Sequence, residues 1–270
     1  MQLVHPEMQL VHILPWVRSK SVMVVLSKKK EHCQMENLKK RVLTKQQKIL
    51  NVNLWMIALV TMTIYCIYGM IGNSLMSYCR DGSICVWPRL FAAAGMEYGI
   101  AGLGITLVCI FRKTSFTDFG LKKKNSALAV SGTVLCFLPH IAYIVLSGQF
   151  EGYEPLSIMV TPDLHKAGIL TAIAGTFIVA VVWGFFEGFN YAVIAQFVSE
   201  RYPSNGKLFD WGALVCTLMG ILFHPIHFDF PGMVDLATTF MALYGMLMIR
   251  KYTKNSWGCV FAFLFIWNAI

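Results

Sequence analysis

Seven apolar runs of about 20 residues, separated by short polar segments, constrain this chain more than any other feature of its sequence. A helix rises 1.5 Å per residue, so each run matches the ~30 Å hydrocarbon core of a bilayer. The runs are too long for core strands and lack the alternation of a β-barrel strand. The sequence therefore predicts an all-α, polytopic bundle of about seven transmembrane helices. The expected spans are Leu54–Met76, Leu90–Phe111, Ser126–Leu146, Ala167–Phe197, Phe209–His227, Val234–Ile249 and Ser256–Ile270.

Composition supports the same conclusion. Hydrophobic residues make up 56% of the chain, charged residues make up 14%, and the mean hydropathy is +0.58. Soluble globular proteins carry about 25% charged residues. These values exclude a soluble enzyme, a secreted disulfide scaffold and a disordered protein.

The distribution of basic residues predicts the orientation of the helices. With the N-terminus inside, 20 of the 23 Lys and Arg residues fall on the inner side. The other three are Arg80, Arg89 and Lys166. This asymmetry follows the positive-inside rule and predicts a multi-pass protein of the cell membrane with its C-terminus outside. It also explains the net charge of +9, so the expected partner is the lipid bilayer and no nucleic acid is expected.

The first 50 residues differ from the rest of the chain. They form a basic segment in which the pentapeptide of residues 1–5 recurs at residues 8–12. We expect a tail that is either disordered or bound at the membrane interface. Translation starts either at Met1 or at Met35. Residues 51–270 form the helical bundle.

Polar residues inside the spans identify a candidate site. Five of them lie 13 to 15 residues from the inner end of their predicted helix, or roughly 20–22 Å deep, and therefore share one layer. Such groups serve either as interhelical hydrogen-bond partners or as a functional site. A Glu–His pair can activate a water molecule or relay a proton. The five are Glu97, His140, Glu187, His224 and Asn268; Asn190 and His227 are further polar residues of the same spans.

Two other chemistries remain open. Cys79 and Cys85 lie close together in sequence on the predicted outer side, where a disulfide can form in an oxidising compartment. Two histidines and a glutamate can hold zinc, although their spacing is not that of an HExxH motif. The cofactor is therefore left undetermined.

The order of several short motifs resembles that of the CPBP family, the CAAX-processing and bacteriocin-immunity membrane proteases. That family has an FGL-basic linker, a Glu-Glu-x-x-x-Arg helix, a Phe-x-x-x-His helix and a final His-x-x-x-Asn helix. A glycine and a basic-Thr-x-Ser-Trp turn precede the last helix. The corresponding segments here are Ser115–Lys124, Phe186–Tyr191, Phe223–His227, Gly245, Lys251–Gly258 and Leu264–Asn268.

The resemblance implies an intramembrane endopeptidase acting on peptides, prenylated peptides or membrane proteins. It assigns Glu187 as the general base, His224 or His227 as its partner and Asn268 as the oxyanion donor. Three departures point to a degenerate site. The second glutamate of the motif is missing beside Glu187, Tyr191 or Ala192 replaces the arginine, and Leu264 replaces the last histidine.

Two other functions compete with a peptidase. The same fold can act as a non-catalytic binding, scaffold or immunity-type protein. A small transporter using Glu97, His140 and Glu187 as a proton or cation path is the third possibility, although the sequence has no evident inverted repeat.

Overall fold

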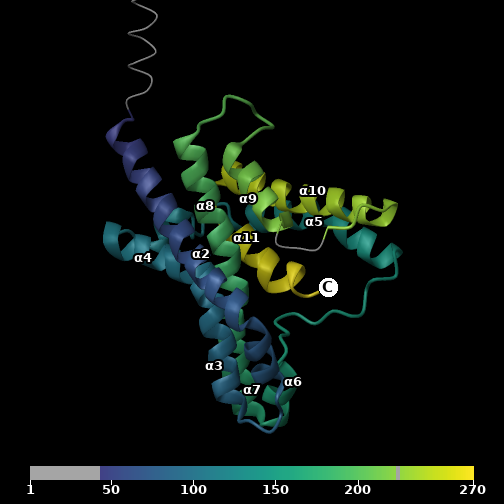
Figure 1. Cartoon of the computed structure of the whole chain (residues 1–270). Helices are drawn as coiled ribbons and strands as arrows, with labels where there is room; N and C mark the ends of the chain where they lie inside the picture. Colours follow the sequence, from purple (N-terminus) through teal and green to yellow (C-terminus); the bar gives the residue numbers. More distant parts are fainter. Residues whose placement is uncertain (1–42, 223–225) are drawn as a thin grey trace, which may run out of the picture. The chain divides into compact units, whose positions relative to one another are not determined.

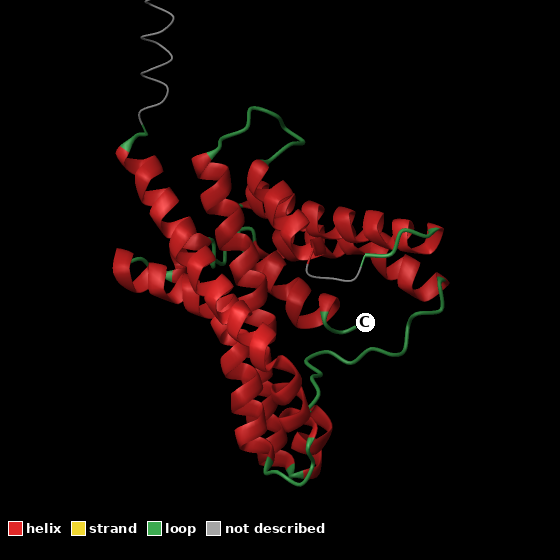
Figure 2. Ribbon diagram, viewed as in Figure 1, coloured by secondary structure: helices red, strands yellow, loops and turns green. Residues whose placement is uncertain are grey.

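The computed structural model describes residues 43–222 and 226–270. Regular structure within these residues is helical throughout, and no strand occurs among them (Figure 1, Figure 2). The predicted all-α class is therefore confirmed. The chain divides into two units, residues 1–48 and 49–270. The predicted basic tail and both possible start residues lie outside the described residues, apart from the segment from residue 43 onward.

Five helical segments are long and apolar enough to cross a membrane, and two more are apolar but shorter. The protein is thus a multi-pass integral membrane protein. The described helices are α2 (Lys45–Arg80), α3 (Val86–Glu97), η1 (Tyr98–Gly102), α4 (Leu103–Arg112), η2 (Phe116–Phe119), α5 (Ser126–Leu146), α6 (Thr161–Lys166), α7 (Ile169–Val179), η3 (Ala180–Phe186), α8 (Glu187–Arg201), α9 (Trp211–Leu222), α10 (Phe230–Thr253), α11 (Trp257–Ala262) and η4 (Phe263–Trp267).

All seven predicted spans correspond to helices, but some of their boundaries were wrong. Helix α2 begins before the predicted Leu54, because Thr44 and Gln47 cap its first turn with reciprocal hydrogen bonds of 3.1 Å. His227, expected in a helix, lies instead in the loop that precedes α10. There Asp229 caps α10 by accepting a hydrogen bond from the Gly232 N–H at 2.9 Å.

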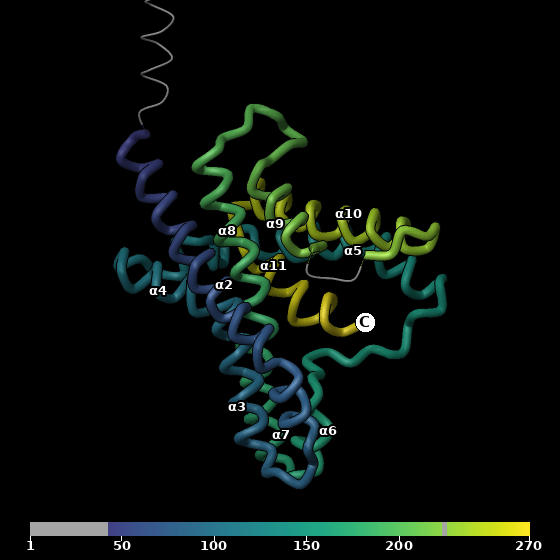
Figure 3. The backbone as a smooth tube through the Cα atoms, viewed as in Figure 1, coloured from purple at the N-terminus to yellow at the C-terminus, as the bar shows by residue number. Residues whose placement is uncertain are grey.

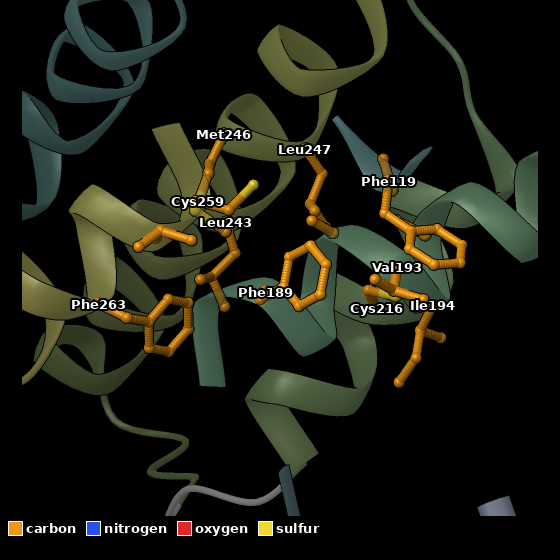
Figure 4. Close-up of a cluster of buried hydrophobic side chains, with 14 of the residues drawn as sticks. Phe119, Phe189, Val193, Ile194, Cys216, Leu243, Met246, Leu247, Cys259 and Phe263 are labelled. Atoms are coloured by element: carbon orange, nitrogen blue, oxygen red, sulfur yellow. The ribbon is translucent and has the colours of Figure 1, made fainter. Parts of the chain in front are cut away.

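The main core lies where α8, α9, α10 and α11 pack together. Phe189 of α8 is fully buried at its centre, with Leu243 and Met246 of α10 and Cys259 of α11 around it (Figure 4). Helix α10 also packs along α5. In contrast, only 6% of the most apolar window of α2 is buried, so the residues of this helix that face outward are available to lipid.

Glycines let the helices of the core approach closely. A Cβ at Gly188 would lie 2.5 Å from the carbonyl oxygen of Cys259, and a Cβ at Gly245 would lie 2.7 Å from Sγ of Cys136. The backbones of α8 and α11 therefore meet at a position that only glycine fits, and at Gly245 the backbone of α10 packs on the Cys136 side chain of α5. Small residues commonly allow such contacts between membrane helices.

Two segments far apart in sequence join at one end of the bundle. Asn255 Nδ2 donates to the carbonyl oxygens of Lys122 at 2.6 Å and Lys124 at 2.8 Å, and the Ser256 N–H donates to the carbonyl of Gly120 at 3.0 Å. We call this the basic end, because its loops and helix termini carry most of the described Lys and Arg residues. Hydrogen bonds from Arg112 to Asn53 (2.8 Å) and from Arg201 to Asn51 (2.6 Å) also lie there.

A smaller apolar cluster occupies the opposite end, where α3 and α7 run side by side (Figure 3). Arg89, only 2% exposed, donates from Nη1 to the Cys79 carbonyl at 3.0 Å and to Asp163 Oδ2 at 2.9 Å. The Arg89 hydrogen bond, together with one from Lys166, holds the pKa of Asp163 below its usual range. The disulfide considered from the sequence is not formed: Cys79 is a buried free thiol directed at the Arg89 carbonyl, and Cys85 is an exposed free thiol.

Candidate functional site

Three of the predicted site residues lie at the ends of π-helical segments. Glu97 immediately precedes η1, Glu187 immediately follows η3, and Asn268 immediately follows η4. Segment η3 packs against both η1 and η4. A π-helical turn shifts the register of the residues that follow it, and such turns occur frequently at functional sites. The three π-helical segments therefore bring their polar end residues toward one region of the bundle.

Contacts between these residues link them directly. Asn268 Nδ2 donates a hydrogen bond of 3.2 Å to Glu187 Oε2. The Glu187 carboxyl also interacts electrostatically with Glu97, and Tyr191 interacts with both carboxyls. Glu187 and Asn268, two residues of the predicted polar layer, are therefore in direct contact. Tyr191 stands at a position where the resemblance would place arginine, and it brings a hydroxyl group there instead of a cation.

Asn190 contributes a further polar group one turn along α8. Its Oδ1 is buried and accepts no hydrogen bond from the described residues. A buried acceptor without a partner costs free energy, and in membranes such groups commonly serve a ligand or an internal water. Asn190 follows Glu187 by three residues, which places both on the same face of α8.

A cavity of about 660 Å³ is lined in part by Asn268, and we call it the His140 cavity. Its wall combines Trp267, the last residue of η4, and Asn268, which follows it, with polar residues from α5, α10 and the loop between α9 and α10. The ionisable residues of the wall are His140, Tyr143, His227, Asp229 and Asp235. Three residues singled out from the sequence, His140, His227 and Asn268, thus line one space.

His140 is held rigidly within this wall. Its Nδ1 lies 3.2 Å from the Thr238 hydroxyl and 3.8 Å from Asp235 Oδ1, and its ring stacks on Trp267 at 5.8 Å. These contacts orient one ring nitrogen toward α10, so the other nitrogen is the one available to the cavity. An imidazole oriented by a carboxylate is suited to donate or accept a proton.

The remaining predicted residues are placed as follows. His224 lies outside the described residues, so its distance from Glu187 is not defined. Leu264 packs against Gly184, so an apolar contact joins η4 to η3. This is the position at which the resemblance described above would place a histidine. Glu187 itself is not part of the cavity wall; it reaches the cavity through Asn268.

Metal binding is not supported by the described side chains. Within residues 43–222 and 226–270, no group of three His, Cys, Asp or Glu residues is arranged to hold a metal ion. The zinc site considered from the sequence includes a second histidine, and one candidate for it, His224, lies outside the described residues.

Some wall residues were not singled out from the sequence. Asp229 is the N-cap residue of α10, and Trp267 precedes Asn268. The Asp229–Pro231 segment is typical of a helix N-terminus and was a usable signal.

Comparisons with protein-family models, curated proteins and solved structures give no match to this chain.

Proposed function

We propose that the protein is an intramembrane endopeptidase resembling the CPBP family, with Glu187, His227 and Asn268 as its hydrolytic residues. The observation that carries this proposal is the hydrogen bond between Asn268 and Glu187 at the wall of a cavity that also holds His227. A base, an amide donor and an imidazole are the groups that hydrolysis of a peptide bond requires.

The joined motifs support the same proposal. The linker of residues 115–124 and the turn of residues 251–258 carry much of the resemblance, and hydrogen bonds hold them together across more than 130 residues of sequence. Gly245, another motif residue, packs closely on Cys136 of α5. Motifs that were matched only by their order thus have a shared structural role in this chain.

The proposed reaction uses these groups in sequence. Glu187 removes a proton from a water molecule, whose oxygen forms a bond to the carbonyl carbon of the substrate. A side-chain amide has two N–H groups, so Asn268 can donate one to Glu187 and the other to the oxyanion. The C–N bond then breaks, the leaving nitrogen takes a proton from protonated His227, and Glu187 returns its proton to the imidazole.

The orientation inferred from the basic residues belongs to this proposal. It places the N-terminus and the basic end inside the cell, and the loop containing His227 toward the outer side. The substrate would then enter the His140 cavity from the outer half of the membrane or from the lipid.

The test is cleavage of quenched fluorescent peptides, both prenylated and unmodified, by purified protein in lipid nanodiscs. Glu187→Gln should abolish turnover while leaving folding intact. Glu151→Gln removes an exposed glutamate from a loop and should cleave at the wild-type rate. Equal cleavage by wild type and Glu187→Gln would exclude Glu187 as the base.

A specific observation favours a second function, that of a binding protein with the same fold. Glu187 does not line the cavity, and apolar packing by Leu264 replaces the family's second donor. On this alternative no peptide is cleaved by any variant. Ligands would instead raise the Tm of the wild type, and Asn268→Ala would remove that increase.

A further inference from the structure

A second cavity, of about 430 Å³, opens at the basic end of the bundle. The C-terminal turns of α8 and α10 form part of its wall, together with residues of the loops that follow α4 and α8. We call it the Arg250 cavity. On α10, Arg250 lies 15 residues beyond Asp235, or roughly 22 Å along the helix, so the two cavities are separate.

Arg250 is the least expected residue of this wall. Its side chain is buried, with 8% of the residue exposed, yet the described residues offer no carboxylate within ion-pair distance of it. Its hydrogen bonds go to neutral groups: Nη2 donates to Gln196 Oε1, and Nε donates to Ser256 Oγ at 3.5 Å. Asp118, Glu200 and Asp210 line the same cavity, but none of them forms an ion pair with Arg250. A buried guanidinium group is costly without a directly bound anion, so an anion in the cavity would stabilise this arrangement.

Two further cations of the wall also lack a bound carboxylate. Lys122 and Lys254 are exposed and make no ion pair within the described part of the chain. Lys251 differs, because its Nζ contacts Asp210 Oδ1 at 3.0 Å. Arg250, Lys122 and Lys254 therefore present charged N–H groups to one space from two different segments of the chain.

The acidic residues of the wall already have donors. Asp210 accepts hydrogen bonds from the Ser199 hydroxyl at 2.5 Å and from the Ala213 N–H at 3.0 Å. Burial raises the pKa of Asp210, but these bonds and the Lys251 ammonium outweigh it and bring the pKa below the usual range. Glu200 accepts from Gln196 at 2.7 Å, and Asp118 accepts from the Ser115 N–H at 2.9 Å.

We propose that the Arg250 cavity binds a phosphate group, carried in the membrane by the headgroup of an anionic phospholipid. The cavity lies at the ends of two membrane-spanning helices, which is the depth of lipid headgroups. Basic pockets between membrane helices are suited to such headgroups, and arginine binds phosphate through parallel hydrogen bonds. This inference does not depend on the proposed peptidase activity.

The test compares purified protein in nanodiscs of phosphatidylcholine with protein in nanodiscs of phosphatidylcholine and phosphatidylglycerol in equal parts. We expect a higher Tm with phosphatidylglycerol and retention of that lipid in native mass spectrometry. Lys122→Gln/Lys254→Gln should weaken phosphatidylglycerol binding about 25-fold, because each lysine near an anionic surface contributes roughly fivefold.

The matched control is Lys113→Gln/Lys123→Gln. Lys113 is an exposed residue that ends its helix with a φ of 53°, as Lys254 does, and Lys123 is the exposed neighbour of Lys122. Neither lines the cavity. The control removes the same charge and should retain wild-type binding. Equal loss in both double variants would overturn the proposal, since it would show a general surface attraction.

A soluble arm distinguishes the source of the phosphate. Inorganic phosphate is added to the protein in phosphatidylcholine nanodiscs, in the same salt concentration. An increase in Tm with phosphatidylglycerol alone identifies a lipid site, whereas an increase with inorganic phosphate, lost in Lys122→Gln/Lys254→Gln, identifies a soluble phosphate ligand. No increase in either arm would contradict a phosphate site.

Discussion

Helix α10 contributes to two cavities of different chemistry. Near its N-terminus it supplies Asp235 to a wall that holds imidazoles, an amide and an indole ring. Near its C-terminus it supplies Arg250 and Lys251, and Lys254 directly after it, to a wall of four cations and three carboxylates. The first wall contains groups that can move protons, and the second contains groups that hold a fixed charge at pH 7. The two proposals thus place hydrolysis and phosphate binding at opposite ends of the same helix.

Asn268→Ala should have the largest effect and should affect the His140 cavity alone. Removing one oxyanion donor lowers hydrolysis by about 10²- to 10³-fold. Stabilisation by phosphatidylglycerol should stay at the wild-type value. The measurements are peptide cleavage and Tm in matched nanodiscs. A change of less than twofold in cleavage would remove Asn268 from the site.

Gly188→Ala should disturb the same cavity through packing. The new methyl group would lie 2.5 Å from the Cys259 carbonyl, which forces α11 away from α8 and costs about 1–3 kcal/mol. Because η4 continues α11, the Asn268–Glu187 hydrogen bond should lengthen and activity should fall. Gly95→Ala is the control, since nothing lies within 4 Å of a Cβ there. Equal Tm values for the two variants would contradict the close contact.

Leu264→His would sharpen the distinction between a hydrolase and a binding protein. It restores the donor that the resemblance expects at a position already facing Gly184 of η3. In a hydrolase we expect the cleavage rate to rise about tenfold, which is less than the 10²- to 10³-fold effect of a donor in its native position. In a binding protein the cleavage rate remains zero. The same peptide panel measures both outcomes.

A fall in pH should produce the smallest effect, and it should act through the Arg250 cavity. The pKa of Asp210 is lowered in the folded protein, so its contribution to stability is present above about pH 4, the unfolded value, and is lost as pH falls through the lower folded value. A series of Tm measurements from neutral to acidic pH detects this loss. Asp210→Asn should reduce that part of the pH dependence; an unchanged curve would exclude Asp210 as its source.

The long apolar runs predicted the spans because length and hydropathy are local properties of the sequence. The polar layer was also partly predictable: counting residues placed Glu187 and Asn268 at one depth, and they form a hydrogen bond. The π-helical turns were not predictable, because they depend on how η1, η3 and η4 pack together. Trp267 gained significance only when the fold placed it beside His140.

The Arg250 cavity was missed for a related reason. Its basic residues were explained by the positive-inside rule, which concerns the side of the membrane and not the grouping of side chains. Whether Lys122 and Lys254 face one space depends on the hydrogen bonds from Asn255 to residues 122 and 124, across more than 130 residues of sequence. Contacts of that separation leave no signature in a single hydropathy profile.

The most direct test of the central claim is a double-mutant cycle between Glu187 and Asn268, measured as peptide cleavage in nanodiscs. Residues that act as one catalytic unit give strongly non-additive losses. We predict that Glu187→Gln/Asn268→Ala cleaves no more slowly than Glu187→Gln alone, because the single substitution already reduces cleavage to the uncatalysed rate. Losses of the two single variants that multiply in the double variant would show that the two residues act independently, and would contradict a site built on their hydrogen bond.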